Sequence, residues 1–306
     1  MKKPTDDTSS FTVGKPKIDT TAWQGLAYIC LGVLFFSTSP VLVRYAGSLN
    51  PIDITFGRMA VGAVAVALFA LLTGTRPRLR QVASARLASY GLVAALHFLF
   101  YIASLSFTSI AHSLTLVYTA PIFVSAFSAA ILKEKLPRAK YIGVATTIIG
   151  ISILVGFEPD LTPRIVIGDV LAICSAICFG LYSIAGRLEK SSYPLLHYTF
   201  SLYAFAALWL LAPVLILRAA NADFSPPSIG SLMAVVALGL FPLGIGHTLY
   251  NASLRYLHAT QVNVVATQEV TGGILLGILV LGEMPTPNAV IGAAIALAGV
   301  VAVIRS

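Results

Sequence analysis

Residues 131–155 read ILKEKLPRAKYIGVATTIIGISILV, and residues 280–304 read VLGEMPTPNAVIGAAIALAGVVAVI. Aligned without a gap, the two stretches share a leucine, a glutamate and an Ile-Gly pair at a constant offset of 149 positions. Each stretch ends in an apolar run of the length that a membrane-crossing helix needs. The chain therefore contains a repeated unit that is built of membrane helices.

The repeat extends upstream from these stretches. Tyr-x-Ala-Ser-Leu occurs at 101–105 and again at 250–254, with the same offset. Further upstream the offset falls to 143, where Phe36 faces Phe179 and Arg44 faces Arg187. Six additional residues before position 250 explain the change of offset, so the repeat covers most of each half of the chain.

Composition places the whole chain in a membrane. Of 306 residues, 57% are hydrophobic and 10% are charged, and the mean hydropathy is +0.88. Soluble domains carry about 25% charged residues, so a water-soluble fold is excluded. Apolar stretches long enough to cross a hydrocarbon core of about 30 Å lie at 23–45, 54–72, 87–107, 111–132, 141–157, 168–186, 195–217, 229–254, 259–281 and 289–304.

These ten stretches predict an all-α integral membrane protein. A membrane β-barrel would alternate polar and apolar residues in strands of about 10 residues, whereas these runs are continuous. Five spans per repeat is an odd number, so the second copy enters the membrane from the opposite side. We expect ten transmembrane helices as two inverted five-helix repeats, at 22–157 and 168–305, after a disordered cytoplasmic tail at 1–21. Many secondary transporters use such repeats for alternating access to a midplane site.

The positive charges predict the orientation in the membrane. Of 20 lysines and arginines, sixteen fall on the side that carries both termini. Arg44, Arg164 and Arg218 fall on the other side, and Arg58 lies inside a span. The positive-inside rule therefore predicts cytoplasmic termini, in the inner membrane of a bacterial-type cell. The net charge of +8 is spread over short loops, so we expect no nucleic-acid partner.

Motifs in both halves resemble those of the EamA family of the drug/metabolite transporter superfamily, over about residues 22–305. Arg58 is similar to an arginine that is common near the start of the family's second helix. The resemblance implies ATP-independent export of small metabolites, often amino acids, and within the family the chain resembles the aromatic amino-acid and methyl viologen exporters. The motifs are Ala120-Pro121, Glu134-Lys135-Leu136-Pro137 and Ile142-Gly143, then Glu269, Gly282-Glu283-Met284-Pro285 and Ile291-Gly292.

One motif departs from the family pattern. The family's usual Glu-Pro in the ninth helix is Glu269-Val270 here, with Gly272-Gly273 just beyond. Any bend at this point must therefore come from the glycines or be absent.

Glu269 is the only one of twelve acidic residues that falls near the middle of an expected span. A carboxylate inside a membrane is costly unless it is paired. It either faces a central cavity, where it holds a substrate ammonium or titrates as a coupling proton site, or anchors neighbouring helices.

Two polar stripes predict a pathway through the bundle. His112, Thr115 and Thr119 share one helix face, because they are spaced i, i+3 and i+7. Their repeat counterparts include Gln261 and Gln268. The stripes either line a hydrated route or hold helices together through polar contacts.

Two tyrosines and an arginine complete the expected site. Tyr101 and Tyr250 are repeat equivalents, and they either offer a ring and a hydroxyl to an aromatic substrate or pack at helix crossings. Arg58 either snorkels to the headgroups or pairs with a substrate carboxylate or a cavity acid. His97 and His247 are either packing histidines, the interpretation that we favour slightly, or proton carriers. The candidate substrate-binding residues are Arg58, Tyr101, His112, Thr115, Thr119, Tyr250, Gln261, Gln268 and Glu269.

Other classes of function lack their motifs. No nucleotide-binding Gly-x-x-x-x-Gly-Lys-Ser/Thr loop, His-Glu-x-x-His or Gly-x-Ser-x-Gly occurs, so neither an ATP-driven pump nor an enzyme is expected. Cys30, Cys174 and Cys178 lie inside apolar runs, so we expect packing residues there and no metal, disulfide or cofactor.

The sequence thus predicts a secondary transporter that exports small metabolites, aromatic amino acids above all, by alternating access. Its expected partners are the small-molecule substrate and the lipid bilayer, and a monomer is expected. The alternative is a transporter of another metabolite or of a drug-like cation, such as a purine, a thiol or a quaternary amine. A channel or sensor is a more distant alternative.

Overall fold

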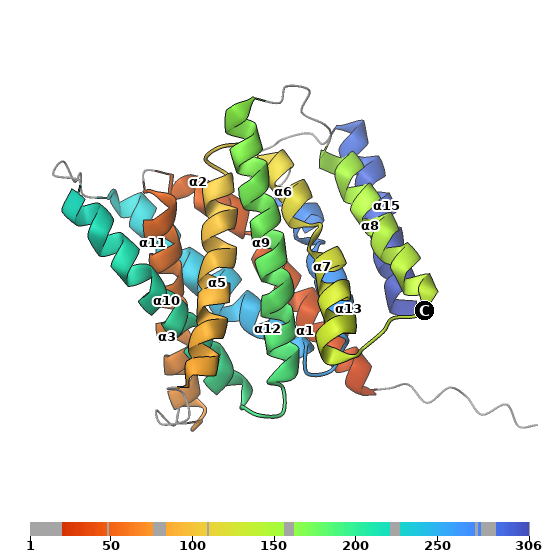
Figure 1. Ribbon diagram of the computed structural model, residues 1–306, viewed down its shortest axis with the longest axis horizontal. Helices are drawn as coiled ribbons and strands as arrows, with labels where there is room; N and C mark the ends of the chain where they lie inside the picture. Colours follow the sequence, from red (N-terminus) through yellow and green to blue (C-terminus); the bar gives the residue numbers. More distant parts are fainter. Residues whose placement is uncertain are drawn as a thin grey trace, which may run out of the picture.

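The protein is a bundle of helices in the computed structural model (Figure 1). The structure describes residues 20–47, 49–75, 84–108, 110–155, 162–220, 227–272, 275–276 and 286–305. Its elements are α1 (Thr20–Phe36), α2 (Ser39–Tyr45), α3 (Pro51–Leu72), α5 (Ala85–Ser104), α6 (Ile110–Val117), α7 (Ala120–Phe127), η1 (Ser128–Leu132), α8 (Arg138–Val155), α9 (Pro163–Leu188), α10 (Leu195–Ala220), α11 (Ile229–Leu238), η2 (Gly239–His247), α12 (Thr248–Ser253), α13 (Ala259–Ala266) and α15 (Pro287–Arg305), where η marks a π-helix.

Length and hydropathy confirm a multi-pass, all-helical membrane fold. The expected number of ten spans stays a prediction, because most of the second half of the expected span 259–281 lies outside the described residues, as does the expected tail up to residue 19. Seven helical stretches among the described residues are long and apolar enough to cross a membrane: Thr20–Tyr45, Pro51–Leu72, Ala85–Ser104, Ser113–Leu132, Pro163–Leu188, Leu195–Ala220 and Ile229–Ser253.

Local sequence signals set where the helices begin. The Asn50 side chain caps α3 by accepting a 2.9 Å hydrogen bond from the Asp53 amide, and Pro51 occupies the first turn. Thr162 caps α9 in the same way, with Pro163 in its first turn. A side-chain acceptor followed by proline satisfies or removes amide donors that a helix start leaves unpaired.

Three expected spans are broken near their middle. The chain leaves the helix at Ser37–Thr38, at Tyr118–Thr119 and at Thr267–Gln268. Pro40 and Pro121 lie just beyond the first two breaks, and a proline removes an amide donor and clashes with the preceding turn. The second and third breaks are repeat equivalents, offset by 149 residues.

At the second and third breaks, a threonine hydroxyl donates a hydrogen bond to a backbone carbonyl of the preceding turn. Thr119 donates to the Leu116 carbonyl at 2.7 Å, and Thr267 donates to the Val264 carbonyl at 2.6 Å. The third break has no proline, and the expectation that a bend there would come from Gly272-Gly273 or be absent is wrong. The turn precedes the glycines. Its threonine, Thr267, donates to a carbonyl that no longer accepts an intrahelical hydrogen bond.

The last helices of the two halves, α8 and α15, pack directly on each other. Gly143 approaches the backbone of Gly299, and Gly150 approaches the backbone of Gly292, so the two helices run antiparallel. A Cβ at Gly150 would collide with the Ala296 backbone. Under the repeat, Gly143 is equivalent to Gly292 and Gly150 to Gly299, so each contact maps onto the other.

An ion-pair network ties the two halves together at one end of the bundle. We name this the basic end; it is the end where α1 and α5 begin and α9 ends (Figure 1). Glu134, from the first half, accepts hydrogen bonds from Arg187 at 3.0 and 3.1 Å and lies 3.1 Å from His258 Nδ1. Arg187 also donates to the Leu254 carbonyl at 2.9 Å.

We expect Gly292→Leu to separate α8 from α15, because the new side chain would collide with the Leu154 backbone. Overpacking costs about 1–3 kcal/mol or more. The apparent unfolding temperature in detergent should fall by several degrees. Ala294→Leu on the exposed face of the same helix is the matched control, and an equal fall in both variants would contradict the prediction.

The Glu134 network should make stability depend on acid pH. Burial raises the pKa of Glu134, but hydrogen bonds and charge from Arg187 and His258 lower it by more, so that the net pKa lies below its ordinary value of 4.5. A lowered folded-state pKa means that the stabilisation is complete at neutral pH and is lost as pH falls below 4.5 through that lowered pKa.

We therefore expect Glu134→Gln to lower the apparent unfolding temperature at pH 7 and to have little effect at the acid limit. Thermal unfolding of both proteins from pH 7 to pH 3 measures this difference. Arg218→Gln, which breaks the more exposed 3.6 Å Arg218–Asp53 pair, should cost less. A deficit for Glu134→Gln that is the same at every pH would contradict this account.

Candidate functional site

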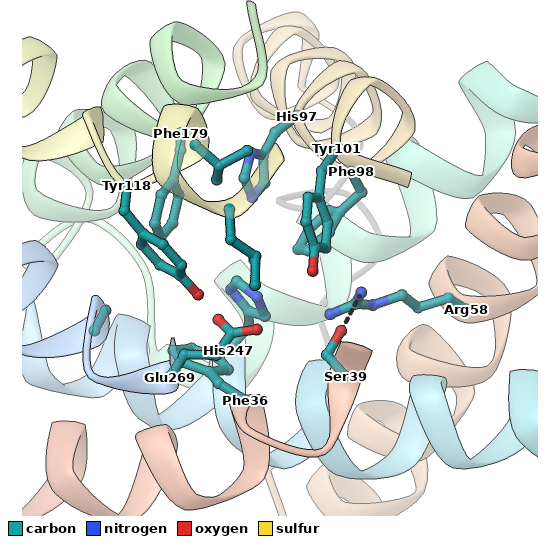
Figure 2. Close-up of a pocket in the computed structure, with 13 residues that line it drawn as sticks. Phe36, Ser39, Arg58, His97, Phe98, Tyr101, Tyr118, Phe179, His247 and Glu269 are labelled. Atoms are coloured by element: carbon teal, nitrogen blue, oxygen red, sulfur yellow. Dashed lines mark hydrogen bonds between the residues drawn. The ribbon is translucent and has the colours of Figure 1, made fainter. Parts of the chain in front are cut away.

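A pocket forms where the three helix breaks meet (Figure 2). Phe36 and Ser39 flank the first break, Tyr118 lies in the second, and Ala266 and Glu269 flank the third. In membranes, irregular backbone occurs where it is buried in protein or lines a cavity. The breaks therefore bring polar side chains and freed backbone to one place inside an apolar bundle.

The pocket walls are largely aromatic. His97 and Phe98 come from α5, Phe179 from α9 and His247 from η2. The His97 ring stacks on Phe179 with centroids 4.6 Å apart, and the His247 ring lies 4.8 Å from that of Phe98. Such walls suit a flat or amphipathic ligand, because ring faces attract both apolar groups and cations.

Arg58 of α3 reaches into the pocket from one side. Its side chain is 1% exposed, so it does not snorkel to the surface. Nη1 donates to Ser39 Oγ at 3.3 Å, and the guanidinium carbon lies 4.4 Å from the centre of the Phe98 ring. Its Nε has no hydrogen-bond partner in the part of the chain that the structure describes. The guanidinium is thus held in place, and its Nε–H remains available to a ligand.

Glu269 faces Arg58 from the opposite side of the pocket (Figure 2). Within the described part of the chain, no ion pair joins its carboxylate to Arg58 or to another base. The Tyr118 hydroxyl points toward Glu269, and the Tyr101 hydroxyl, which has no hydrogen-bond partner among the described residues, points toward Arg58 (Figure 2). A buried arginine and a partly buried glutamate therefore flank the same space without forming an ion pair with each other.

His97 presents an acceptor to this space. Ser175 Oγ donates to the His97 carbonyl at 2.9 Å, and His97 Nδ1 lies 3.0 Å from that hydroxyl and 3.1 Å from the Ser175 carbonyl. A carbonyl can only accept, so Nδ1 carries the proton. Nε2 is then the acceptor nitrogen of a neutral imidazole.

The geometry suits a zwitterion. A guanidinium binds a carboxylate through a fork of N–H donors, and a carboxylate holds an ammonium by charge-assisted hydrogen bonds. The free volume at the centre is about 30 Å³, enough for about two water molecules. A larger ligand needs the surrounding side chains or helices to move apart.

Three of the nine candidate residues line this pocket, namely Arg58, Tyr101 and Glu269. Tyr250 lies just outside it, with its ring 5.3 Å from that of Phe179 and its hydroxyl 2.6 Å from Ser183. The role of all nine in substrate binding stays a prediction.

The expected polar stripes do not form. The breaks interrupt both helices, so that Thr119 and Gln268 lie in turns rather than on a continuous helix face. Gln261 instead accepts from the His258 amide at the start of α13, as part of a capping box. Thr115 lies in α6 and does not line the pocket, and the side chain of His112 lies outside the described residues.

The repeat contained a signal for pocket residues that sequence reasoning missed. Phe36 and Phe179 were aligned as repeat equivalents, and both line the pocket. His97 and His247, expected to be packing residues, also line it. Tyr118 had no distinguishing pattern, because only the break after α6 places its hydroxyl beside Glu269.

Comparisons with known proteins agree with this architecture. The model of the EamA-like transporter family matches residues 23–156 and again residues 166–305. A solved crystal structure with 21% sequence identity superposes with a TM-score of 0.76, over 93% of this chain and 97% of that one. The fold is therefore shared with a known structure.

Several curated relatives are named as transporters. An uncharacterized transporter of Archaeoglobus fulgidus is 27% identical, over 90% of this chain and 94% of its own. A pseudopaline exporter of Pseudomonas aeruginosa is 24% identical, over 92% and 96%. A probable terminal-alkyne amino-acid exporter of Streptantibioticus cattleyicolor is 25% identical, over 94% and 95%. Since the family model covers both halves, the chain belongs to the EamA-like transporter family and, with it, to the drug/metabolite transporter superfamily.

Proposed function

We propose that the protein exports amino acids, aromatic ones above all, by alternating access around the pocket between Arg58 and Glu269. The observation that carries this proposal is a buried arginine and a partly buried glutamate that face one space with no ion pair between them among the described residues. The α-carboxylate of an amino acid binds Arg58, and its ammonium binds Glu269. The rings of Phe98, Phe179 and Tyr118 receive the side chain.

Inverted repeats supply the alternation. Reciprocal contacts between Gly143 and Gly299 and between Gly150 and Gly292 are what a pseudo-two-fold axis across the helices produces. Equivalent breaks at Tyr118–Thr119 and Thr267–Gln268 place discontinuous helices at the site, as in other transporters built from such repeats. Rocking one half against the other then widens the pocket toward each side in turn.

Names of relatives support the class of substrate and the direction. The Streptantibioticus protein is named as a probable amino-acid exporter and the Pseudomonas protein as a pseudopaline exporter. The bias of basic residues supports cytoplasmic termini in the inner membrane, so the basic end faces the cytoplasm. Glu269 is the first candidate for proton coupling, and facilitated diffusion is the alternative mechanism.

Counterflow in proteoliposomes tests the substrate class. We expect labelled L-phenylalanine, L-tyrosine or L-tryptophan to exchange against the same unlabelled amino acid in a saturable way. A purine, a thiol and a quaternary amine serve as comparison substrates, with and without a pH gradient. If none of the aromatic amino acids exchanges, the proposed substrate is wrong, and ohmic single-channel current would indicate a channel instead.

Two conservative variants test the binding mode. Glu269→Gln and Arg58→Lys should each lower kcat/KM for exchange by roughly 10- to 100-fold, because each removes charge-assisted contacts to a desolvated ligand. The matched controls are Asp53→Asn and Arg218→Lys. They make the same kinds of change, carboxylate to amide and arginine to lysine, at the end of the bundle opposite the basic end. Unchanged exchange in either pocket variant would show that its charge does not bind substrate.

A further inference from the structure

A group of buried polar side chains lies between the pocket and the basic end. Tyr250 marks its start, because its ring lies 5.3 Å from that of Phe179 in the pocket wall. Gly186 marks its far side, where a Cβ would lie 2.7 Å from Asn251 Oδ1. Arg187, next in the chain, belongs to the ion-pair network. We name the group the amide layer; it comprises Tyr182, Ser183, Tyr250, Asn251 and Asn263.

One half of the amide layer is a hydrogen-bond chain with a fixed direction. Ser183 Oγ donates to the Phe179 carbonyl at 2.7 Å, so its single proton is used. Tyr250 must then donate across the 2.6 Å contact to Ser183. The Tyr250 oxygen in turn accepts from Asn263 Nδ2 at 3.2 Å. The amide of Asn263 is therefore oriented with its oxygen away from this chain.

The other half fixes Asn251 in the same way. Asn251 Nδ2 donates to the His247 carbonyl at 2.7 Å and also to the Tyr182 hydroxyl. Because a carbonyl can only accept, the amide cannot be turned over. Among the described residues, no donor reaches its oxygen or that of Asn263.

Both amide oxygens are deeply buried. The residues Asn251 and Asn263 are 2% and 1% exposed. A buried acceptor without a donor costs about 1–3 kcal/mol. Two such acceptors on neighbouring helices, between a ligand pocket and the end of the bundle, indicate a place where a donor-bearing group binds during part of the transport cycle.

We propose that Asn251 and Asn263 form a second, transient site for the substrate's amino group on the route between the pocket and the basic end. This inference rests on the proposed function. The side-chain oxygens accept N–H donors, so the site favours a primary ammonium over a carboxylate or a fully methylated nitrogen. The route runs between α9 on one side and α12 and α13 on the other.

The ion-pair network closes this route in the present structure. Glu134 binds Arg187 at the end of α9 and His258 at the start of α13. When the two halves rock apart, that network has to open, and the amide oxygens then face the widened route. The substrate ammonium passes from these oxygens to Glu269, which is the stronger acceptor because it is charged.

A series of N-methylated substrates isolates the contribution of N–H donors. L-phenylalanine and its N,N,N-trimethyl derivative both carry a positive nitrogen and a carboxylate, but only the first can donate from nitrogen. The measured quantity is the ratio of their kcat/KM values in counterflow. Affinity at the central pocket is followed separately, by thermal stabilisation of the detergent-solubilised protein with each compound.

We expect Asn263→Leu and Asn251→Leu each to reduce the wild-type ratio by about tenfold, the size of one charge-assisted hydrogen bond. Stabilisation by L-phenylalanine should stay near the wild-type value. Asn263→Asp keeps the acceptor oxygens and should preserve the discrimination. Thr147→Val is the control for loss of a buried polar group, because its hydroxyl bonds the Gly143 carbonyl at the distant contact between α8 and α15.

The outcomes separate this inference from the proposed function. If the wild-type protein exchanges L-phenylalanine but Asn263→Leu keeps the wild-type ratio, the amide layer is only structural and the second site is wrong. If the wild-type protein exchanges no amino acid, the proposed function is wrong and the second site falls with it. Should Asn251→Leu fail to fold, the comparison of Asn263→Leu with Asn263→Asp is sufficient to test the proposal.

Discussion

Backbone polar groups cannot be left unpaired inside a membrane, and this constraint decides how the pocket is built. A helix that breaks in the bilayer frees amides and carbonyls that water does not reach. Here the breaks at Tyr118–Thr119 and Thr267–Gln268 place a threonine hydroxyl on a carbonyl of the preceding turn. The breaks are therefore tolerated, and they place Tyr118, within one turn, and Glu269, directly after the other, at the pocket.

Close backbone contact supplies the rigidity around this opening. Repeat-equivalent glycines bring α8 and α15 together so tightly that a Cβ at Gly150 or Gly292 would collide with the opposite backbone, and close packing is one of the main attractions between helices in lipid. The network around Glu134 closes the basic end by linking the two halves. Between these two attachments, Arg58 and Glu269 remain unpaired with each other, and the amide oxygens of Asn251 and Asn263 remain without donors. A ligand that moves along a route past these groups would supply the ion-pair and hydrogen-bond partners that they lack.

Sequence reasoning identified the charges more reliably than the polar stripes. Glu269 stood out because a single acid in an apolar run is unusual, and Arg58 because it was the one base inside a span. Both line the pocket. The stripe of His112, Thr115 and Thr119 assumed an unbroken helix, and the break at Tyr118–Thr119 removes the 3.6-residue periodicity on which it depended. Gln261 was misplaced for a different reason, since it lies in the first turn of its helix, where its side chain caps the helix start instead of joining a polar face.

Membrane location, helical structure and the repetition of the two halves could all be predicted from the amino-acid sequence. Those properties follow from composition and from local spacing, which tertiary contacts do not alter. The packing of the helices in three dimensions places Phe36, Phe179, His97 and His247 around one pocket and points Arg58 into it instead of toward the headgroups. These facts depend on how broken helices from both halves meet, because the repeat pairs equivalent positions, such as Phe36 and Phe179, without showing that they come together.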